Sequence, residues 1–579
     1  MDLDRVFGKT KPTVNKKGLK EYPKDYNPIF EYWELIETGK EVVCDKIYRT
    51  YKKIVHDFTD NSSEFFYSHA RANHVIEFIE NFCRHSKGKL GGQPVVLELW
   101  EKALLATIFG FIDIEGNRKY REAVLIVGKK NGKSLLASCI GLYLQVADGE
   151  PGPEVYAAAT KRDQAKIIWS EAKRMRNKSS ALRKRIKALV AELVSDFNDG
   201  VFRPLASDVD TLDGPNIHGA LLDEIHQWKN GKALYDIIAD GTSAREQPLI
   251  FITSTAGKIR EDFYDLKYDE IERVINGYFD PNGYKDERFI AFVYELDNRK
   301  EWTDPKMWRK ANPGLGTIKN EKILAEKVRR AQENPLLVKN LICKEFNIRE
   351  TSSEAWLTFE QLNNPAVFDL RELKPRYGIG GADLSSTTDL TNATVIFMVP
   401  GNEQIFATQM YWLPEDLLET REKDDKIPYS IWRDMGLLRT TPGNKVHHKF
   451  VTEWFLEVQN QLDIYLPWIG YDNWSATYWV EEMKGYFGAE AMEPVIQGKK
   501  TLSGPMKALG ADLEAKKINY NNHPILKWCL SNVAIDTDRN LNISPCKTKN
   551  QRRRIDGFSG LIDAYVALER HYEDYLALI

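Results

Sequence analysis

The sequence predicts two successive α/β domains with a small helical region in front of them. Between about residues 95 and 350, short apolar runs alternate with helical stretches, which is typical of a largely parallel sheet covered on both faces. From about residue 376, three successive strands precede alternating helices and strands. A chain of 579 residues is also too long for a single hydrophobic core.

The composition limits the class of protein. Hydrophobic residues make up 42% and charged residues 28% of the chain, which is ordinary for a globular protein. No apolar run approaches the roughly 18–20 residues that span a bilayer, so we expect no membrane segment. The six cysteines are scattered, which suits a reducing compartment. A formal charge of −3 excludes a globally basic nucleic-acid binder but permits a locally basic groove.

The domain boundaries follow from breaks in these patterns. We expect a helical N-terminal region over residues 1–85, a first α/β domain over 86–350, a linker over 351–375 and a second α/β domain over 376–579. The runs that predict buried strands in the first domain are 123–127, 155–159, 220–222 and 249–252. Those of the second domain are 377–383, 393–399, 404–413, 467–472 and 492–496.

A phosphate-binding loop follows the first of these strands. Its residues are Gly128, Lys129, Lys130, Asn131, Gly132, Lys133 and Ser134. In such a loop backbone N–H groups cradle phosphates, the lysine reaches the β- and γ-phosphates, and the hydroxyl holds Mg²⁺. The full pattern has glycine where this chain has Val127, so the loop alone is weak support for a P-loop ATPase domain.

Two later strand ends strengthen the prediction of a nucleotide site. Asp223 and Glu224 close an apolar strand, where a metal-holding aspartate and a water-orienting glutamate belong. The next strand ends in Ser254, Thr255 and Ala256, small residues suited to sensing the γ-phosphate and coupling its loss to neighbouring elements. Together these patterns predict ATP hydrolysis with Mg²⁺.

The second domain carries dispersed aspartates at element ends. Asp383 and Asp472 end the first and fourth strands, and Asp556 opens the last helix. Three strands followed by alternating helix and strand is the order of a ribonuclease H-like fold, in which those two strands are neighbours. Carboxylates without His or Cys partners favour Mg²⁺ or Mn²⁺ and two-metal phosphodiester cleavage. Asp563 lies two helical turns after Asp556 and is a rival or a fourth ligand.

The ordered set of motifs resembles the large terminase subunits of tailed bacteriophages, in the branch that includes phage HK97. Besides the loop at 128–134 and Asp223-Glu224-Ile225-His226, matching stretches are 158–165, 211–214, 247–250, 255–257, 311–313, 381–385 and 555–557. The resemblance runs from about residue 30 to 570 and rests on the order of these motifs rather than on any one of them.

The resemblance implies a DNA-packaging motor fused to an endonuclease that cuts concatemeric DNA. Lys133, Ser134 and Asp223 would then bind phosphate and Mg²⁺, and Glu224 would orient the attacking water. Asp383, Asp472 and Asp556 would bind the nuclease metals. The implied partners are double-stranded DNA, a small terminase subunit and a portal protein, with a homo-oligomeric ring during packaging in the host cytoplasm.

Two positions depart from the family pattern. Lys129 stands where the family often has arginine, and lysine cannot make the bidentate fork of arginine. Glu101 stands where an adenine-contacting glutamine is expected, so how the base is recognised stays open. Arg245 is a candidate arginine finger acting between subunits, and a surface ion pair is the alternative role.

Two basic windows are candidates for contacts with DNA phosphates. The first contains Lys173, Arg174, Arg176, Lys178, Arg183, Lys184, Arg185 and Lys187 without an acidic residue. The second, Arg552-Arg553-Arg554, directly precedes the Asp556 region. Contacts of this kind position the backbone without selecting a base sequence.

Two other functional classes stay open at this stage. Asp223-Glu224-Ile225-His226 also matches the D-E-x-H signature of nucleic-acid helicases, which would need a second motor domain after residue 350. A non-enzymatic capsid or portal component would have no use for Lys133 together with Asp223 and Glu224.

Overall fold

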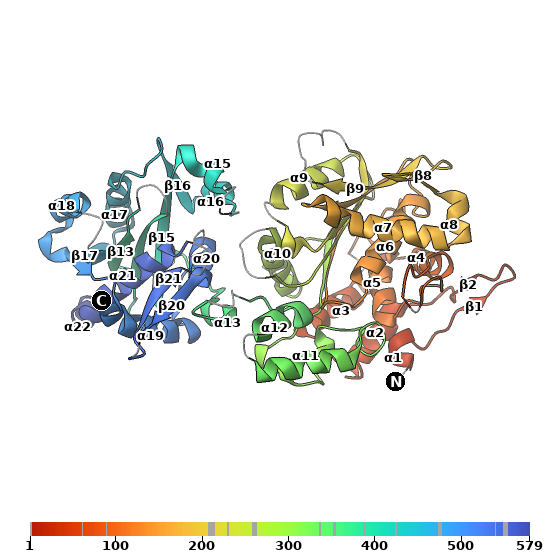
Figure 1. The fold of residues 1–579 in the computed structure, drawn as a ribbon, viewed down its shortest axis with the longest axis horizontal. Coiled ribbons are helices and arrows are strands. Elements are labelled where there is room, and N and C mark those ends of the chain that lie inside the picture. Colours follow the sequence, from red (N-terminus) through yellow and green to blue (C-terminus); the bar gives the residue numbers. More distant parts are fainter. Residues whose placement is uncertain are drawn as a thin grey trace. The chain divides into compact units, whose positions relative to one another are not determined.

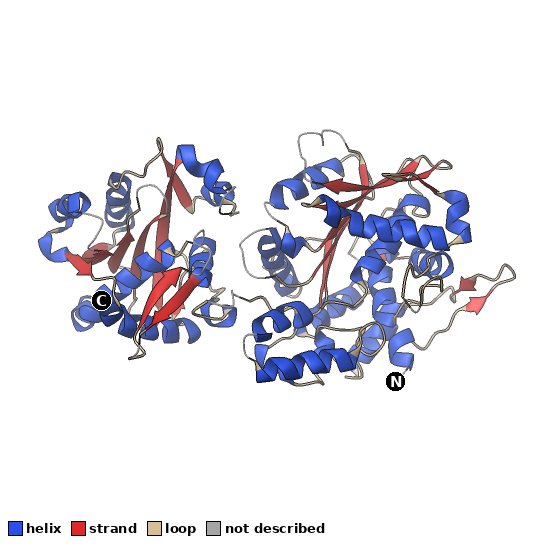
Figure 2. Ribbon diagram, viewed as in Figure 1, coloured by secondary structure: helices blue, strands red, loops and turns tan. Residues whose placement is uncertain are grey.

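The computed structural model describes residues 3–60, 62–88, 90–206, 215–228, 231–257, 263–334, 337–350, 355–385, 390–422, 425, 427–472, 477–538, 540–547 and 554–579 (Figure 1). The chain forms two compact units. Unit 1 contains Met1–Gly257 and Asp262–Arg349, and unit 2 consists mainly of Glu350–Ile579. In each unit the strands form a sheet with helices against it (Figure 2).

Unit 1 is built on an eight-stranded sheet of order β12-β5-β11-β10-β6-β9-β8-β7. The strands are β5 (Glu122–Ile126), β6 (Glu154–Ala159), β7 (Lys187–Ala188), β8 (Leu193–Ser195), β9 (Gly200–Ala206), β10 (Ile217–Asp223), β11 (Leu249–Ser254) and β12 (Phe289–Val293). The six strands from β12 to β9 are parallel, whereas β8 and β7 add antiparallel pairs at one edge. The predicted mostly parallel sheet is confirmed.

Both faces of this sheet are buried, which explains why its strands are apolar throughout. Leu125 and its same-face neighbours pack with α6 (Lys133–Val146) and α7 (Arg162–Lys178), whereas Val124 and the opposite face pack with α9 (Gly231–Gly241) and α10 (Phe263–Gly277). The first of these cores also contains α2 (Pro28–Glu37), α3 (Asp45–Asp57), α4 (His69–Phe82) and α5 (Leu99–Gly110). The helical region expected over residues 1–85 therefore shares its core with the first α/β domain.

A smaller core follows the last strand of unit 1. It joins Trp308 and Leu315 to the helices α11 (Glu321–Glu333) and α12 (Val338–Phe346). Helix α12 is the last helix before the chain enters unit 2 at Glu350.

Unit 2 has a sheet of order β16-β15-β14-β13-β17-β18, with β19 pairing with β15. The strands are β13 (Tyr377–Asp383), β14 (Thr391–Phe397), β15 (Ile405–Pro414), β16 (Leu438–Thr441), β17 (Tyr465–Asp472), β18 (Met492–Val495) and β19 (Ile518–Asn519). β13, β14 and β15 are antiparallel neighbours, and β17 and β18 continue the sheet in parallel with β13. This is the predicted ribonuclease H-like arrangement.

Helices lie on both faces of the second sheet. The helices α17 (Lys449–Leu462) and α18 (Thr477–Phe487) pack on one face. On the other lie α19 (Lys499–Glu514), α20 (Pro524–Asn532) and α21 (Asp556–Arg570), with α22 (Tyr572–Leu578) at the chain end. A separate hairpin, β20 (Val533–Thr537) with β21 (Ile543–Lys547), lies against α19.

The stretch 351–375, expected to be a linker, contributes to the core of unit 2 where it is described. Leu357, Phe359 and Leu362 are buried in that core, and α13 (Phe359–Leu362) and α14 (Leu370–Leu373) form within the stretch. The reason is its apolar content: Asn363-Asn364-Pro365 interrupts helices, but the residues before it are large and hydrophobic.

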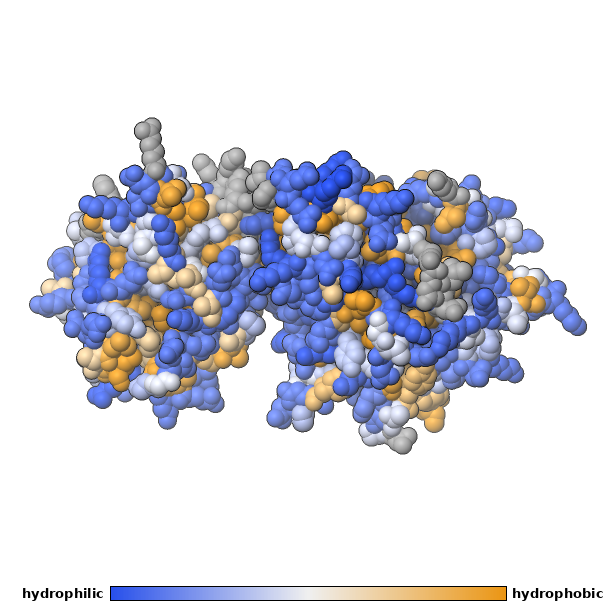
Figure 3. All heavy atoms as spheres, turned by 90° about the horizontal axis from the view of Figure 1, so that it is seen from below, coloured by the Kyte–Doolittle hydropathy of each residue, from blue (hydrophilic) through white to orange (hydrophobic). Residues whose placement is uncertain are grey.

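Polar side chains dominate the face in Figure 3, and apolar patches are scattered over it. Within the described ranges, no helix combines the length and apolar character that a bilayer crossing requires.

Candidate functional site

The phosphate-binding loop joins the end of β5 to the start of α6 at the carboxyl edge of the first sheet. Gly132, the residue before the helix, has φ 85°, a left-handed conformation that favours glycine. Lys130 is also left-handed, with φ 70°. Strained backbone of this kind gathers at ligand-binding loops, where the surroundings hold it in place.

The phosphate-binding loop is in contact with Ala311, Asn312 and Glu345, which lie in or beside the small core. Gly128 N–H donates to the carbonyl of Ala311 at 3.0 Å. A Cβ at Gly128 would lie 2.4 Å from Asn312 Oδ1 and 2.5 Å from the carbonyl of Glu345, so only glycine fits. Asn131 Nδ2 donates to Asn312 Oδ1 at 2.9 Å. The conformation of the loop is therefore set largely by a segment about 180 residues further along the chain.

The loop meets the acidic pair at the end of β10. Lys133 Nζ forms an ion pair with Glu224 Oε1 at 2.8 Å. Ser134 Oγ donates to Asp223 Oδ2 at 3.0 Å, and Thr253 Oγ1 donates to Asp223 Oδ1 at 2.7 Å. The structure thus brings together the lysine, the hydroxyl and the two carboxylates that the sequence singles out.

The two carboxylates have different electrostatic surroundings. Burial and the adjacent Glu224 raise the pKa of Asp223. Burial opposes ionisation of Glu224, but a hydrogen bond from His226 and the charge of Lys133 outweigh it and lower its pKa to about 2. His226 Nδ1 lies 3.0 Å from Glu224 Oε2. Glu224 itself has φ 52°, so its backbone is held in a strained conformation at the strand end.

A cavity of about 860 Å³ opens beside the loop. Lys133, Ser134 and Glu224 line it, together with His85 and residues of α7 such as Arg174. The cavity is large enough for a nucleotide. Its N–H-bearing loop, lysine and hydroxyl match what a nucleoside triphosphate with a divalent metal requires.

Glu101 lies next to Gly132 of the phosphate-binding loop. It is 3% exposed, and its Oε2 accepts a hydrogen bond from Glu98 N–H at 2.9 Å, which caps the start of α5. A Cβ at Gly132 would lie 3.6 Å from Glu101 Oε1. Burial, and next the charge of Glu98, raise the pKa of Glu101 to about 8.

The loop after β11 connects the acidic pair to the end of α12. Ser254 Oγ lies 3.1 Å from His226 Nδ1, and Thr255 Oγ1 is buried without a hydrogen-bond partner among the described residues. Ala256 N–H donates to Asn347 Oδ1 at 3.0 Å. Of the three residues predicted to couple hydrolysis to neighbouring elements, Ser254 therefore contacts His226, two residues after Glu224, and Ala256 contacts the residue that follows α12.

The end of α12 contacts both the phosphate-binding loop and the loop after β11. No local sequence pattern predicted these contacts. Lys129 N–H donates to the carbonyl of Lys344 at 3.0 Å, and Cys343 Sγ donates to the carbonyl of Ala256 at 3.3 Å. Asn347 is left-handed with φ 58° and fully buried, and its Nδ2 donates to the carbonyl of Tyr294 at 2.7 Å. An asparagine directly after a helix is the one sequence signal of this arrangement.

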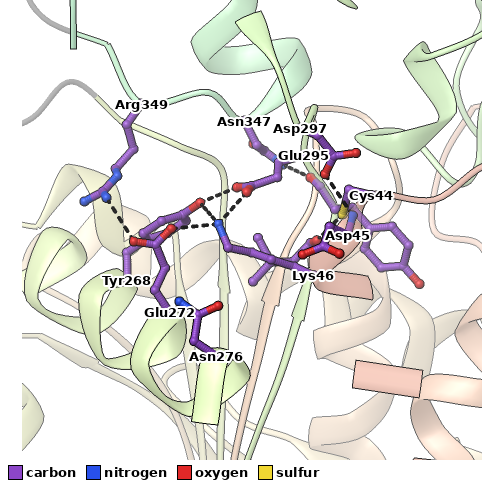
Figure 4. A network of polar contacts seen from close by, with 12 residues as sticks. Cys44, Asp45, Lys46, Tyr268, Glu272, Asn276, Glu295, Asp297, Asn347 and Arg349 are labelled. Atoms are coloured by element: carbon purple, nitrogen blue, oxygen red, sulfur yellow. Dashed lines mark hydrogen bonds and ion pairs between the residues drawn. The ribbon is translucent and has the colours of Figure 1, made fainter. Parts of the chain in front are cut away.

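A polar network anchors the segment that leaves unit 1 (Figure 4). The guanidinium of Arg349 lies 4.2 Å from the ring centre of Tyr268 and 3.6 Å from Glu272 Oε2, both on α10. Lys46 from α3 joins the same cluster, with its Nζ 2.9 Å from Glu272 and 2.6 Å from Glu295. These contacts therefore fix the position of Arg349, the last residue of unit 1, two residues after Asn347.

Arg245 lies at the other edge of the sheet, where β6 and β10 begin. Its Nη1 is 2.8 Å from Glu150 Oε1, and its Nη2 donates to the carbonyl of Gly152 at 2.8 Å. Arg245 is thus far along the strands from the phosphate-binding loop of its own chain.

In unit 2, Asp383 and Asp472 end neighbouring parallel strands. The last register pair of β13 and β17 joins Ala382 to Tyr471, and the two aspartates directly follow it. Because side chains alternate along a strand, each aspartate shares a face with the glycine two residues before it, Gly381 or Gly470. That face is covered by α21.

These two glycines let α21 lie directly on the sheet. A Cβ at Gly381 would lie 2.1 Å from the carbonyl of Gly560, and one at Gly470 would lie 2.2 Å from the carbonyl of Asp563. Gly381 and Gly470 are register partners on β13 and β17. The close approach places Asp563 over the ends of the two strands.

The surroundings of Asp563 confirm this placement. Asp563 is fully buried, and its Oδ2 has no hydrogen-bond partner among the described residues. Burial raises the pKa of Asp563 well above its usual range, and the charges of Asp383 and Asp472 raise it further. Its Oδ1 accepts a hydrogen bond from Gln497 Nε2 at 2.8 Å, and no local sequence pattern indicates this contact.

Asp556 opens α21 and is 4% exposed. Burial raises the pKa of the Cys529 thiol, and the charges of Asp556 and then Asp383 raise it further, so both carboxylates lie near this thiol. The charge of Asp383 thus acts on Cys529 as well as on Asp563.

The donor chemistry of this cluster fits a hard divalent cation, since it offers carboxylate oxygens and one of them is buried without a partner. In the part of the chain that the structure describes, no three His, Cys, Asp or Glu side chains are arranged so that they could hold a metal ion. The carboxylates thus share one region of unit 2 without converging on a single point.

The basic windows are partly used within the protein. In the first, Arg176 Nε donates to the carbonyl of Ile186 at 2.7 Å, and Arg183 Nη1 donates to the carbonyl of Asn177 at 2.6 Å. In the second, Arg554 forms a buried ion pair with Asp425 at 3.0 Å. Arg552 and Arg553 lie outside the described residues, as does the stretch 211–214.

Two family models match the chain. The terminase large subunit ATPase domain matches residues 99–273, and the terminase large subunit endonuclease domain matches residues 284–571. Together they cover most of the sequence, and the second begins before the end of unit 1.

The chain is also similar to individual proteins. The terminase large subunit of Enterobacteria phage HK97 is 26% identical over 495 residues, 84% of this chain and 93% of its own length. The YmfN protein of Escherichia coli K12 is 28% identical over 366 residues, 61% of this chain and 77% of its own length. The crystal structure of the HK97 large terminase has a TM-score of 0.46 at 24% identity, covering 86% of this chain and 99% of that one.

Proposed function

The chain belongs to the family of terminase large subunits, and we propose that unit 1 hydrolyses ATP at Lys133, Ser134, Asp223 and Glu224 while unit 2 cuts DNA at its acidic cluster. A terminase large subunit acts on DNA during packaging and combines ATPase with endonuclease activity. The meeting of the phosphate-binding loop with the strand-end acids is the observation that carries the ATPase assignment.

The geometry supports a proposed role for each group in ATP hydrolysis. The loop N–H groups and Lys133 would bind the phosphates, and Ser134 and Asp223 would hold Mg²⁺. Lys133 must leave Glu224 to reach a phosphate, which frees the carboxylate to accept a proton from the attacking water. The contact with His226, which also lowers the pKa of Glu224, does not depend on Lys133 and still favours the ionised carboxylate after Lys133 has moved.

The test of this assignment is Glu224→Gln. The variant should bind ATP but hydrolyse it at least about 100-fold more slowly, because it has lost the proton-accepting group. Hydrolysis at the wild-type rate would remove Glu224 from the mechanism. Binding of a fluorescent ATP analogue serves as the control that the cavity is intact.

For the nuclease, Asp383, Asp472 and Asp556 are the proposed metal ligands, and Asp563 joins them as a fourth. Because these carboxylates do not converge on one point in this structure, they would have to close on the ions. Mg²⁺ is the proposed ion, and Mn²⁺ can replace it. When bound, such ions would activate water and stabilise the charge on the phosphate. The charge of Asp383 acts on Asp563 and, together with that of Asp556, on Cys529, which supports its place among the ligands.

The helicase alternative is not favoured. A helicase needs a second motor domain, whereas residues 284–571 match a nuclease domain. A small terminase subunit and a portal protein remain the proposed partners, with a homo-oligomeric ring in the host cytoplasm. Arg245 remains the proposed arginine finger, which would have to reach the cavity of a neighbouring subunit.

A further inference from the structure

A basic hairpin projects from unit 1 near the N-terminus (Figure 1). It consists of β1 (Thr13–Val14), a turn and β2 (Lys20–Glu21), paired antiparallel. Residues 9–24 contain six lysines and a single acidic residue, Glu21. We propose that this hairpin, residues 9–24, binds the phosphate backbone of double-stranded DNA, which rests on the proposed function of the chain.

Most of the positive charge on the hairpin is exposed and uncompensated. Lys9 and Lys20 form ion pairs with Glu34 and Glu80. The other four lysines are exposed or at the turn and make no ion pair with any described residue. They are Lys11, Lys16, Lys17 and Lys24. The acids outside the hairpin that contact it are Glu31, Glu34, Glu77 and Glu80, and they do so through Lys9, Thr10, Lys20 and Tyr22. The four exposed lysines therefore keep their positive charge free for an anionic partner.

The hairpin is held firmly at its base, so its lysines are presented in a fixed place. Lys20 N–H donates to Asn81 Oδ1 at 2.8 Å, and Asn81 Nδ2 donates back to the carbonyl of Lys20 at 2.9 Å. Tyr22 N–H donates to Glu77 Oε1 at 2.7 Å. At the turn, Asn15 Oδ1 accepts from Lys17 N–H at 2.8 Å and Gly18 adopts φ 76°.

The chemistry of the hairpin favours nucleic acid over a protein partner. Protein interfaces are enriched in aromatic residues and depleted in lysine. The one aromatic residue among residues 9–24, Tyr22, is buried, and the exposed apolar surface is essentially Val14, which is 68% exposed. A two-stranded ribbon also has dimensions that fit a DNA groove. The five residue steps from Lys11 to Lys16, which include β1 and the start of the turn, span at most about 16 Å, or about five base-pair steps.

The hairpin is also joined to the nucleotide cavity. Asn81, which holds β2, lies near the end of α4, and four residues later His85 lines the cavity. A DNA contact at the hairpin would therefore act on the helix whose end borders the bound nucleotide.

The experiment compares the full-length wild type with the quadruple variant K11Q/K16Q/K17Q/K24Q. The matched control is K40Q/K285Q/K306Q/K322Q, which removes four exposed lysines elsewhere in unit 1. Fluorescence anisotropy with a labelled 40-base-pair duplex of random sequence is recorded from 50 to 200 mM salt without nucleotide. ATPase activity without DNA checks that unit 1 remains folded.

We expect the hairpin variant to bind at least about tenfold more weakly and the control variant to bind like the wild type. If each lysine neutralises one phosphate, the slope of log K against log salt falls by about 0.9 per lysine, or up to about 3.6. An unchanged slope in the hairpin variant, with salt-dependent binding by the wild type, would overturn the hairpin proposal and leave the proposed function standing. Absence of DNA binding by the wild type would overturn both.

Wild-type DNA binding by the hairpin variant, combined with a loss of DNA packaging into procapsids, would assign the hairpin to a protein partner. That outcome also contradicts the proposal.

Discussion

Replacing Gly470 with alanine should separate the two layers that form the nuclease site. The new Cβ would lie 2.2 Å from the carbonyl oxygen and 2.7 Å from the carbonyl carbon of Asp563. Ordinary contact begins at 3.4 Å, so the two groups must move apart by about 1.2 Å. The new Cβ is attached directly to the backbone of β17, and the carbonyl belongs to the backbone of α21. Neither group can therefore rotate away as the end of a flexible side chain would.

The expected cost has two parts. Overpacking of a well-packed core typically costs about 1–3 kcal/mol, which for a domain of this size lowers the Tm of unit 2 by about 2–12 °C. A displacement of about 1 Å at a reacting centre can reduce the rate about 100-fold. We therefore expect Gly470→Ala to lose most of its plasmid-cleaving activity while ATP hydrolysis in unit 1 stays unchanged.

The matched control is Gly485→Ala. Gly485 lies within α18 of the same unit, and a Cβ there would meet nothing within 4 Å. Alanine in a helix interior is about 0.5–1 kcal/mol more favourable than glycine, so this variant should be slightly stabilised and fully active. Cleavage is measured as the rate of plasmid linearisation with Mg²⁺ or Mn²⁺, and stability by thermal unfolding. Full cleavage by Gly470→Ala would refute the idea that the close approach of α21 builds the site.

Three further predictions concern single buried groups. Glu101→Gln should raise the Tm of unit 1 at pH 8 and have little effect at pH 5. Because the pKa of Glu101 in the folded state is raised to about 8, the wild type has the full stability from the protonated carboxyl below about pH 4.5. It loses this stability as the pH rises through 8, whereas glutamine does not ionise. Equal shifts at both pH values would contradict the burial of an ionisable group there. Asn347→Ala should leave Ala256 N–H and the carbonyl of Tyr294 without partners, destabilise unit 1 by about 2–4 kcal/mol and lower kcat for ATP more than it raises KM; a change in KM alone would argue against a coupling role. Asp563→Asn should abolish the rise in Tm that Mg²⁺ or Mn²⁺ gives the wild type, and metal stabilisation that persists undiminished would exclude Asp563 as a ligand.

Local sequence patterns were sufficient to predict the P-loop region and the strands β5, β6, β10 and β11 of the first sheet and β13, β14, β15, β17 and β18 of the second, but not β9, β12, β16 or β19. The buried strands are recognisable because both faces of each sheet are covered, which makes the runs at 123–127 and 220–222 apolar throughout. The antiparallel edge formed by β7 and β8 was not predicted, since those strands are two and three residues long. The helices of residues 1–85 looked like a separate region because their core partners, such as Phe292, lie more than 200 residues away.

The acidic cluster shows what a single sequence leaves open. Asp383 and Asp472 are recognisable because they lie at strand ends. Whether Asp563 belongs to the same cluster depends on how closely α21 lies on the sheet, which the sequence does not reveal. A retrospective signal exists: Gly381-Ala382-Asp383 and Gly470-Tyr471-Asp472 both read Gly-x-Asp at the end of a strand. The contacts of Asn347 and Gln497 had no such signal, because hydrogen bonds between distant segments leave no local pattern.

The most direct test of two separate reactions in one chain measures ATP hydrolysis and plasmid cleavage for Asp383→Ala and Lys133→Ala side by side. We predict that Asp383→Ala loses metal-dependent cleavage and retains ATP hydrolysis, whereas Lys133→Ala loses ATP hydrolysis and retains cleavage in the absence of ATP. Loss of both activities in either well-folded variant would contradict the account, as would a wild-type protein that hydrolyses ATP but cuts DNA with neither Mg²⁺ nor Mn²⁺.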